Sequence, residues 1–241
     1  RAVTLMYGSA LARPTPIVAV DYTTYPNDPR PDSVVVEVRR DGGLLAATWF
    51  SAAGFDLAQK QVHRLVVPID AVAAGLGTGA HPVQVTLRRF ANGAWLGSAD
   101  TASTTLLVVD RRSSPFGAGW TLAGVERLHP NQLGNAVLLA FADGSALLFR
   151  PSANPADTSY VSPAGEHSRL VRLSAGGFVR TLAGGRVAIE YDSAGLVRSI
   201  RDNNPTPNVA TYHWSPDPLD AARLDSIVDP ALRAVRSDSD I

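Results

Sequence analysis

Apolar residues in this chain occur in short stretches separated by turns, and the pattern predicts an all-β protein. A helix would place apolar side chains at i, i+3, i+4 and i+7 over about ten residues or more. Only Asp70–Leu76 and Asp220–Leu224 offer a turn or two of that pattern. In His81–Phe90, by contrast, apolar and polar residues alternate, as in a strand that buries one face.

The first half of the chain predicts a β-sandwich. Asp41-Gly42-Gly43 and Asn92-Gly93 separate β-prone stretches, and Asn-Gly is a strong signal for a two-residue hairpin turn. The expected strands are Val34–Arg39, Leu44–Phe50, Val62–Ile69, His81–Phe90, Ala94–Ser98 and Thr104–Val109. Short strands at this spacing are typical of an immunoglobulin- or fibronectin-like sandwich. We place it at residues 23–112, after an opening hairpin at residues 1–22.

Residues 113–120 mark a domain boundary, and β-hairpins follow one another from there to residue 241. Proline and glycine residues interrupt any regular element at the boundary. The expected hairpins are Ala136–Phe141 with Ala146–Arg150, Leu170–Leu173 with Phe178–Leu182, Arg186–Tyr191 with Leu196–Arg201, and Ala210–Trp214 with Leu224–Val228. Because one hairpin cannot bury its apolar face alone, neighbouring hairpins must pair edge to edge into an extended or spiralling sheet.

Two segments of the second half are similar to each other, which indicates stacked supersecondary units. The repeated positions are Tyr191, Asp192, Gly195, Ser199, Ile200 and Asp202 in one copy and Tyr212, Ser226, Ile227 and Asp229 in the other. We expect Tyr191 to pack on the sheet, while Asp192 begins a turn that Gly195 completes with a positive φ.

The first of these copies resembles a YD repeat of the RHS/YD-repeat superfamily, since it reads Tyr-Asp-x-x-Gly-x-Val-x-Ser-Ile-x-Asp. The second copy lacks an aspartate after Tyr212 and carries a proline-rich insertion, so its turn must differ. The segment Ser114–Trp120, continued by Leu122–Leu128, resembles the lead-in motif of many bacterial members. Arg1–Tyr22 resembles the opening hairpin that such proteins carry.

The resemblance implies a structural protein that is secreted or displayed at the bacterial cell surface. In this family a long β-sheet spirals into a hollow shell, which encases toxic domains in bacteria and displays an adhesion module in the animal teneurins. The chain would then supply a cap and the first wall of the shell, and its partner would be the remainder of one long polypeptide. In the family, self-cleavage uses carboxylates near the far end of the shell, a segment that we do not expect in this chain. We therefore assign no catalytic residue and expect no enzyme.

Composition excludes several classes of function. The 22 basic residues balance the 22 acidic ones, which argues against binding to nucleic acid or an anionic membrane by bulk charge. The chain has no cysteine, so thiol catalysis, disulfides and thiolate metal sites are absent. The sequence contains no apolar run of about 18 residues, which is the length that predicts a membrane-spanning helix.

Candidate sites for metals and cofactors are weak, and we predict neither. The five histidines form no HxH or HExxH pair. Gly75–Gly79 lacks the strand–loop–helix order of a phosphate-binding loop. Asp202–Asn204 and Asp217–Asp220 offer oxygen ligands for calcium, although Asx turns explain them more simply.

We expect the joint between the two domains to include Pro115, Phe116, Gly117, Gly119 and Trp120. In this interpretation the two aromatic residues lock the sandwich onto the first repeats, and the glycines allow the backbones to approach closely. Loss of a buried aromatic side chain such as Trp120 would cost about 3–5 kcal/mol.

Two alternatives to the structural interpretation remain open at this stage. Exposed aromatic residues in the sandwich loops would favour a module that binds a glycan or a cell-surface receptor, and the candidates are Tyr22, Tyr25 and Phe55. An unpaired sheet edge would instead favour pairing with further copies of the chain, which gives an extracellular fibre if the contact does not close.

Overall fold

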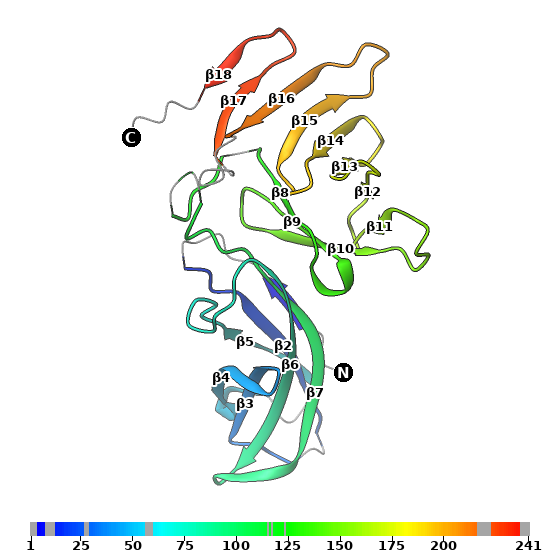
Figure 1. Cartoon of the computed structure of the whole chain (residues 1–241). Coiled ribbons are helices and arrows are strands. Elements are labelled where there is room, and N and C mark those ends of the chain that lie inside the picture. The colour runs from blue at the N-terminus through cyan, green and yellow to red at the C-terminus, as the bar shows by residue number, and fades with distance from the viewer. Residues whose placement is uncertain are drawn as a thin grey trace. The chain divides into compact units, whose positions relative to one another are not determined.

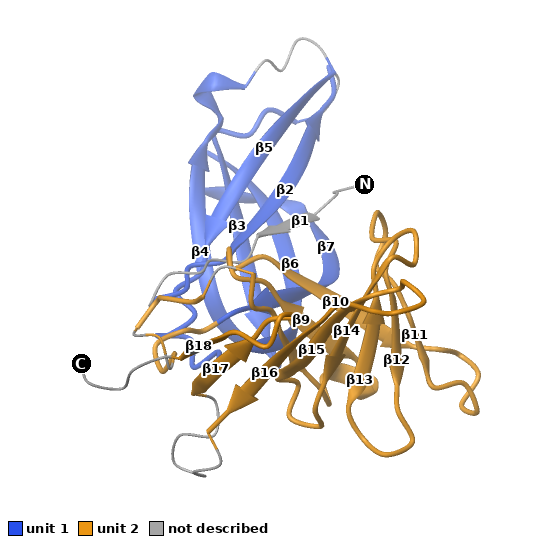
Figure 2. Ribbon diagram, turned by 90° about the horizontal axis from the view of Figure 1, so that it is seen from above, with its two compact units in different colours: residues 1–109 blue, residues 110–241 orange. Residues whose placement is uncertain are grey.

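The structure, a computed structural model, describes residues 4–7, 13–26, 29–55, 60–114, 116, 118–122, 124–215 and 223–236. These residues form β-strands and two short 3-10 segments, Ala52–Gly54 and Leu133–Asn135, so the all-β prediction is confirmed. The chain divides into two compact units, residues 1–109 and 110–241, which Figure 2 colours separately. The division lies close to the boundary expected after residue 112.

The first unit contains two antiparallel sheets (Figure 1). The strands of the first sheet, in the order β1-β2-β5, are β1 (Thr4–Tyr7), β2 (Ile17–Thr24) and β5 (Gln61–Pro68). The strands of the second sheet, in the order β4-β3-β6-β7, are β3 (Ser33–Arg40), β4 (Gly43–Ser51), β6 (Gly79–Ala91) and β7 (Ala94–Val108). Strand β7 is continuous where the sequence predicted two strands.

Both sheets of the first unit contribute to one apolar core. Val34, Val36 and Val38 alternate along β3, so they lie on one face of the strand, and all three are fully buried. Val18 and Val20 of β2 are buried in the same core. Strand β2, which begins within the opening hairpin expected at residues 1–22, therefore completes the core of the first unit.

The second unit is one antiparallel sheet of eleven strands that follow one another in chain order from β8 to β18. Its strands are β8 (Arg127–His129), β9 (Val137–Ala140), β10 (Ala146–Pro151), β11 (Ser159–Val161), β12 (Arg169–Arg172), β13 (Phe178–Thr181), β14 (Val187–Tyr191), β15 (Val197–Asp202), β16 (Val209–Trp214), β17 (Leu224–Val228) and β18 (Ala234–Arg236). The predicted edge-to-edge pairing of hairpins is confirmed, and the sequence missed β11 and β18. In the described ranges no ladder joins β8 to β18, so the sheet is open.

A five-residue turn recurs in this sheet. The amide of Asp192 donates to the carbonyl of Leu196 at 2.9 Å, and the Asp192 Oδ1 accepts hydrogen bonds from the amides of Ala194 and Leu196. Gly195, the fourth residue, has a φ of 82°, as the sequence predicted. The turn that joins β17 to β18 repeats these contacts, with Asp229 in the first position and Arg233 in the fifth.

Leu232 occupies the glycine position of the second turn, with a φ of 63° and an exposed side chain. An L-residue with a side chain pays about 1 kcal/mol in this region, whereas glycine does not. We expect Leu232→Gly to be more stable than Leu232→Ala by about 1 kcal/mol, as measured by hydrogen exchange of the β17–β18 amides. Equal protection in the two variants would contradict this account of the turn.

Candidate functional site

The second unit has an apolar core on its sheet, and that core contains an ionised side chain. The apolar residues of this core are Leu128, Val137, Leu139, Phe149, Leu170, Phe178, Ile189, Tyr191 and Val197. Arg180 lies among them on β13 and is only 5% exposed. A guanidinium group is almost never buried without partners, so its contacts identify the most constrained polar site that the structure describes.

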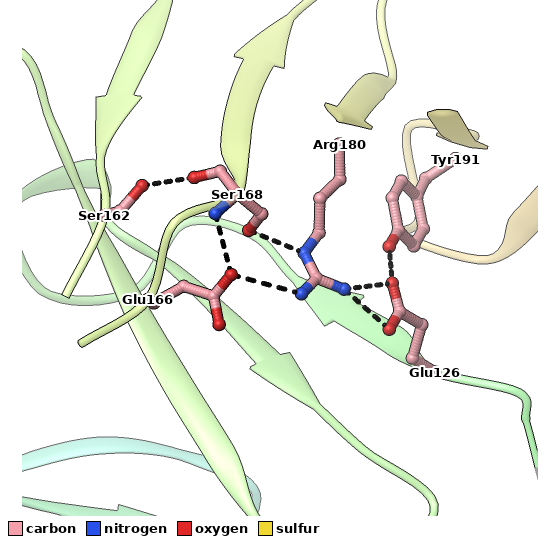
Figure 3. Close-up of polar contacts among 6 residues, drawn as sticks. All are labelled: Glu126, Ser162, Glu166, Ser168, Arg180 and Tyr191. Atoms are coloured by element: carbon pink, nitrogen blue, oxygen red, sulfur yellow. Dashed lines mark hydrogen bonds and ion pairs between the residues drawn. The ribbon is translucent and has the colours of Figure 1, made fainter. Parts of the chain in front are cut away.

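Arg180 is held by partners on three sides (Figure 3). Its Nη1 donates to both carboxylate oxygens of Glu126, at 3.0 and 2.8 Å, and its Nε donates to the Ser168 Oγ at 2.9 Å. The Nη2 lies 3.5 Å from the Glu166 Oε1, which also accepts the amide hydrogen of Ser168 at 2.8 Å. The phenol of Tyr191 donates to the Glu126 Oε1.

In the Glu126–Arg180–Tyr191 cluster, Arg180 stays charged and Tyr191 stays neutral. Desolvation lowers the pKa of Arg180, but the charge and hydrogen bond of Glu126 outweigh it and raise that pKa overall. Burial raises the pKa of Tyr191, and the adjacent Glu126 carboxylate raises it further, so the phenol stays protonated. The hydrogen bond from Ser168 lowers the pKa of Glu166. A buried ion pair, hydrogen-bonded to a neutral phenol, results.

These contacts join elements that are distant in the sequence. Glu126 precedes β8, Arg180 belongs to β13 and Tyr191 ends β14, and 54 and 65 residues separate Glu126 from its two partners. All three side chains are engaged with one another, and Tyr191 is 2% exposed. The arrangement fixes the start of β8 to the middle of the sheet.

An open pocket of about 460 Å³ adjoins Glu126 and the turn between β9 and β10. Its lining includes Phe141, whose ring lies 5.4 Å from the Arg180 guanidinium carbon, and Asp143. The Asp143 Oδ1 accepts hydrogen bonds from the amide and hydroxyl of Ser145, at 2.8 and 2.6 Å. Both carboxylates of the pocket therefore already have partners within the chain.

A second contact brings β8 against the turn between β14 and β15. The Leu128 amide donates to the Gly195 carbonyl at 2.9 Å, and Arg127 forms an isolated bridge with Leu196. A Cβ on Gly195 would lie 2.0 Å from the carbonyl oxygen of Leu128. Only glycine fits there. The sequence identified Gly195 as a turn residue but carried no sign of its second role against β8.

His129 ends β8 in surroundings that oppose its protonation. Burial, together with the positive charges of Arg127 and Arg111, lowers the pKa of His129 to about 4. In an unfolded chain the same group titrates near 6.5. The unfolded chain therefore binds more protons between these two values, and the free energy of unfolding must fall as the pH drops from about 6.5 to about 4.

We expect removal of this histidine to flatten the acid side of the stability curve. Between pH 7 and pH 4, wild type should lose about 3 kcal/mol more than His129→Gln, at about 1.4 kcal/mol per unit of pKa difference. Urea denaturation at a series of pH values, at constant ionic strength, measures the difference. Parallel curves for the two proteins would show that His129 is not the group responsible.

The residues of the predicted repeat occupy structural positions. Tyr191 is in the core, whereas Ile200 and Tyr212 are partly buried against it. Asp192, Asp202 and Asp229 each begin a turn and accept backbone amides, which confirms the Asx interpretation for Asp202. Ser199 donates to Glu190 at 3.2 Å. Gly195 has both roles described above, and Ser226 and Ile227 of β17 are half-buried.

Three of the five residues of the expected joint lie within the described residues, all of them in the second unit. Pro115 and Gly117 lie outside the described residues. Phe116 is half-buried and donates its amide to the Ser114 Oγ, and the Gly119 amide donates to the carbonyl of Arg111 at 2.9 Å. Trp120 is 72% exposed. The loss of about 3–5 kcal/mol expected on its removal assumes a buried ring, and the stability of a Trp120→Ala variant tests it.

The aromatic residues proposed for ligand binding are also placed differently from the prediction. Tyr22 is 6% exposed and belongs to the core of the first unit. Phe55 packs against that core and stacks on the ring of His63, with centroids 4.1 Å apart. Tyr25 alone of the three is exposed, with the Lys60 Nζ 5.6 Å from its ring centroid. They do not form a common exposed surface.

In the described parts of the chain, no group of three or more histidine or acidic side chains is placed to hold a metal ion. Asp217–Asp220, the second calcium candidate, lies outside those parts. No helix there is long and apolar enough to span a bilayer.

Comparison with known proteins gives no match to this chain among protein-family models, curated proteins or solved structures.

Proposed function

We propose that this chain is a non-enzymatic structural module of a secreted or cell-surface RHS/YD-repeat protein. It forms the cap and first wall of a β-shell that encloses a toxin domain or displays an adhesion surface. The observation that carries the proposal is the chain-order sheet of the second unit, with its recurring aspartate-initiated turn. Such a sheet grows by adding the next hairpin at its edge, without rearranging the earlier strands.

Contacts of β8 support a wall whose first strand is fastened to the rest of the sheet. Strands β8 and β15 are not neighbours in the strand order, yet Arg127 bridges to Leu196 and the Leu128 amide bonds to Gly195. The Glu126–Arg180–Tyr191 cluster fastens the same start of the sheet to β13 and β14. A wall that encloses another domain must resist opening, and these buried contacts oppose separation of its first strands.

The strand order of the first unit supports an immunoglobulin-like cap. Strands β1, β2 and β5 share one sheet and β3, β6 and β7 the other, as strands A, B, E and C, F, G do in immunoglobulin domains. Strand β4 pairs with β3 rather than with β5, which departs from the constant-type domain. A small rigid sandwich of this kind suits a plug, because its core is complete without the second unit.

A second candidate function is a fibre subunit. Among the described strands, β18 pairs only with β17 and is the last in the order. An edge strand with unsatisfied backbone groups can pair with another copy, and a head-to-tail contact that does not close produces a filament.

Light scattering followed by negative-stain imaging distinguishes the two candidates. We expect a monomer of 25.4 kDa at all concentrations, which supports a module whose partner is its own polypeptide. Regular fibres or concentration-dependent polymers would overturn the shell proposal and favour strand-exchange assembly. Substitution of Ala234 in the edge strand β18 by proline then tests the edge in polymers, because proline removes a backbone donor of that strand.

A further inference from the structure

The outer face of the β4-β3-β6-β7 sheet carries exposed aromatic side chains that the proposed function does not use. Since Val34, Val36 and Val38 face the core, the alternate residues of β3 face outward. Strand register places Trp49 of β4 opposite Val35, and Phe90 of β6 opposite Ser33, on that outer face. Trp95 of β7 lies opposite Phe90.

These side chains form an aromatic strip, Trp49–Phe90–Trp95, across the sheet. The rings of Trp49 and Phe90 are 4.9 Å apart between centroids, and Trp49 and Trp95 are 60% and 53% exposed. From β4 to β7 the strip crosses three strand spacings, or about 14 Å. Tryptophans this exposed contribute little to the core, and exposed apolar clusters of this kind mark binding surfaces.

The orientation of the strip is fixed by contacts within the chain. The Trp95 Nε1 donates to the carbonyl of Ser98 at 3.4 Å, so its polar atom is engaged and the ring face remains available. Val35 lies next to Trp49 in the register and is only 2% exposed, which gives the strip a packed base. A rigid platform loses little conformational entropy when a ligand stacks on it.

Charge on this face favours a neutral ligand. Both carboxylate oxygens of Glu37 accept from guanidinium groups, one from the Arg88 Nη1 at 2.8 Å and the other from the Arg39 Nε at 3.1 Å. Because both cations already pair with Glu37, an anionic polymer would have to displace that carboxylate. Their remaining N–H groups can still donate to hydroxyl oxygens beside the strip.

We propose that the outer face of the β4-β3-β6-β7 sheet binds a neutral, extended polysaccharide of β-linked pyranoses. The flat C–H face of a pyranose ring stacks on an indole, while its hydroxyls accept from Arg88 and Arg39. An elongated strip that crosses four strands matches an extended chain better than a coiled one. The inference does not rest on the shell function, because it concerns only the first unit.

The experiment measures retention of the full chain on insoluble cellulose, xylan, mannan and chitin, with titration of the matching soluble oligosaccharides. We expect retention on at least one of them. Trp49→Ala and Trp95→Ala should each weaken binding about ten-fold or more, as for anchoring aromatic residues. Trp120→Ala is the matched control, because that tryptophan is also exposed but lies in the second unit, and its affinity should stay that of wild type.

Three outcomes would overturn the proposal. One is the absence of retention on all four polysaccharides, and another is equal retention of all three variants. The third is that light scattering shows a dimer, that Trp49→Ala dissociates it, and that no polysaccharide retains the chain. This result would assign the strip to contact between copies. Melting temperatures close to that of wild type check that Trp49→Ala and Trp95→Ala remain folded.

Discussion

Gly195→Ala is expected to destabilise the second unit by about 3–5 kcal/mol, which is near the upper end for a single substitution. Two causes act together. The φ of 82° costs an alanine about 1 kcal/mol. In addition, the new Cβ would lie 2.0 Å from the Leu128 carbonyl oxygen, a rigid backbone atom that cannot move aside without breaking the contact between β8 and the β14–β15 turn.

Gly184→Ala separates these two causes. Gly184 has a φ of 81°, and a Cβ on it would meet nothing within 4 Å. The Gly184→Ala variant should therefore lose only about 1 kcal/mol of unfolding free energy. Hydrogen exchange of the amides in residues 124–202 gives local opening free energies for the second unit alone. Equal losses in the two variants would mean that the close approach of β8 contributes nothing to the stability of the sheet.

Arg180→Met is expected to cost the second unit about 3–5 kcal/mol, because it leaves the carboxylate of Glu126 buried without its cation. The side chains of Arg180 and Glu126 are 6% and 12% exposed, so water cannot replace the lost partner. The double variant Arg180→Met/Glu126→Gln should recover at least half of the loss. In that variant residue 126 carries no buried charge, and the glutamine oxygen still accepts the Tyr191 hydroxyl.

Arg201→Met is the control for this pair. Arg201 lies 3.3 Å from Glu190, with side chains 43% and 39% exposed, and exposed ion pairs contribute less than about 1 kcal/mol. Urea denaturation followed by hydrogen exchange measures all the variants. If Arg180→Met and Arg201→Met lost equal stability, or if the double variant were no better than Arg180→Met, the buried ion pair would not be the clamp that holds β8.

Local features of the fold could be predicted because their causes are contained in a few neighbouring residues. The Asn92-Gly93 turn needs two residues with positive φ, and both have it, at 51° and 75°. The five-residue turn that contains Asp192 and Gly195 could be predicted for the same reason, because the residues that determine it lie within the turn. Alternation in His81–Phe90 likewise identified a strand that the structure extends to Gly79–Ala91.

Prediction failed where burial depends on distant residues. The sequence gives no measure of whether an aromatic ring is covered, so it places Tyr22 in an exposed site, whereas that side chain is 6% exposed. The candidate site itself was missed. Glu126 falls within the segment that resembles a lead-in motif and Tyr191 within the repeat, but Arg180 and Ser168 belong to no recognisable motif. The association of these residues depends on which strands meet across the face of the sheet.

The sequence by itself determined the all-β class, the turns and the order of the hairpins, because φ preferences, apolar alternation and edge pairing act between neighbouring residues. Only the tertiary structure decided that β2 completes the core of the first unit and that β8 meets Gly195. It also decided that Glu126 pairs with Arg180 and that Trp49 and Trp95 share an exposed face. These relations depend on the register and packing of segments separated by tens of residues, and many different sequences with the same local pattern would pack differently.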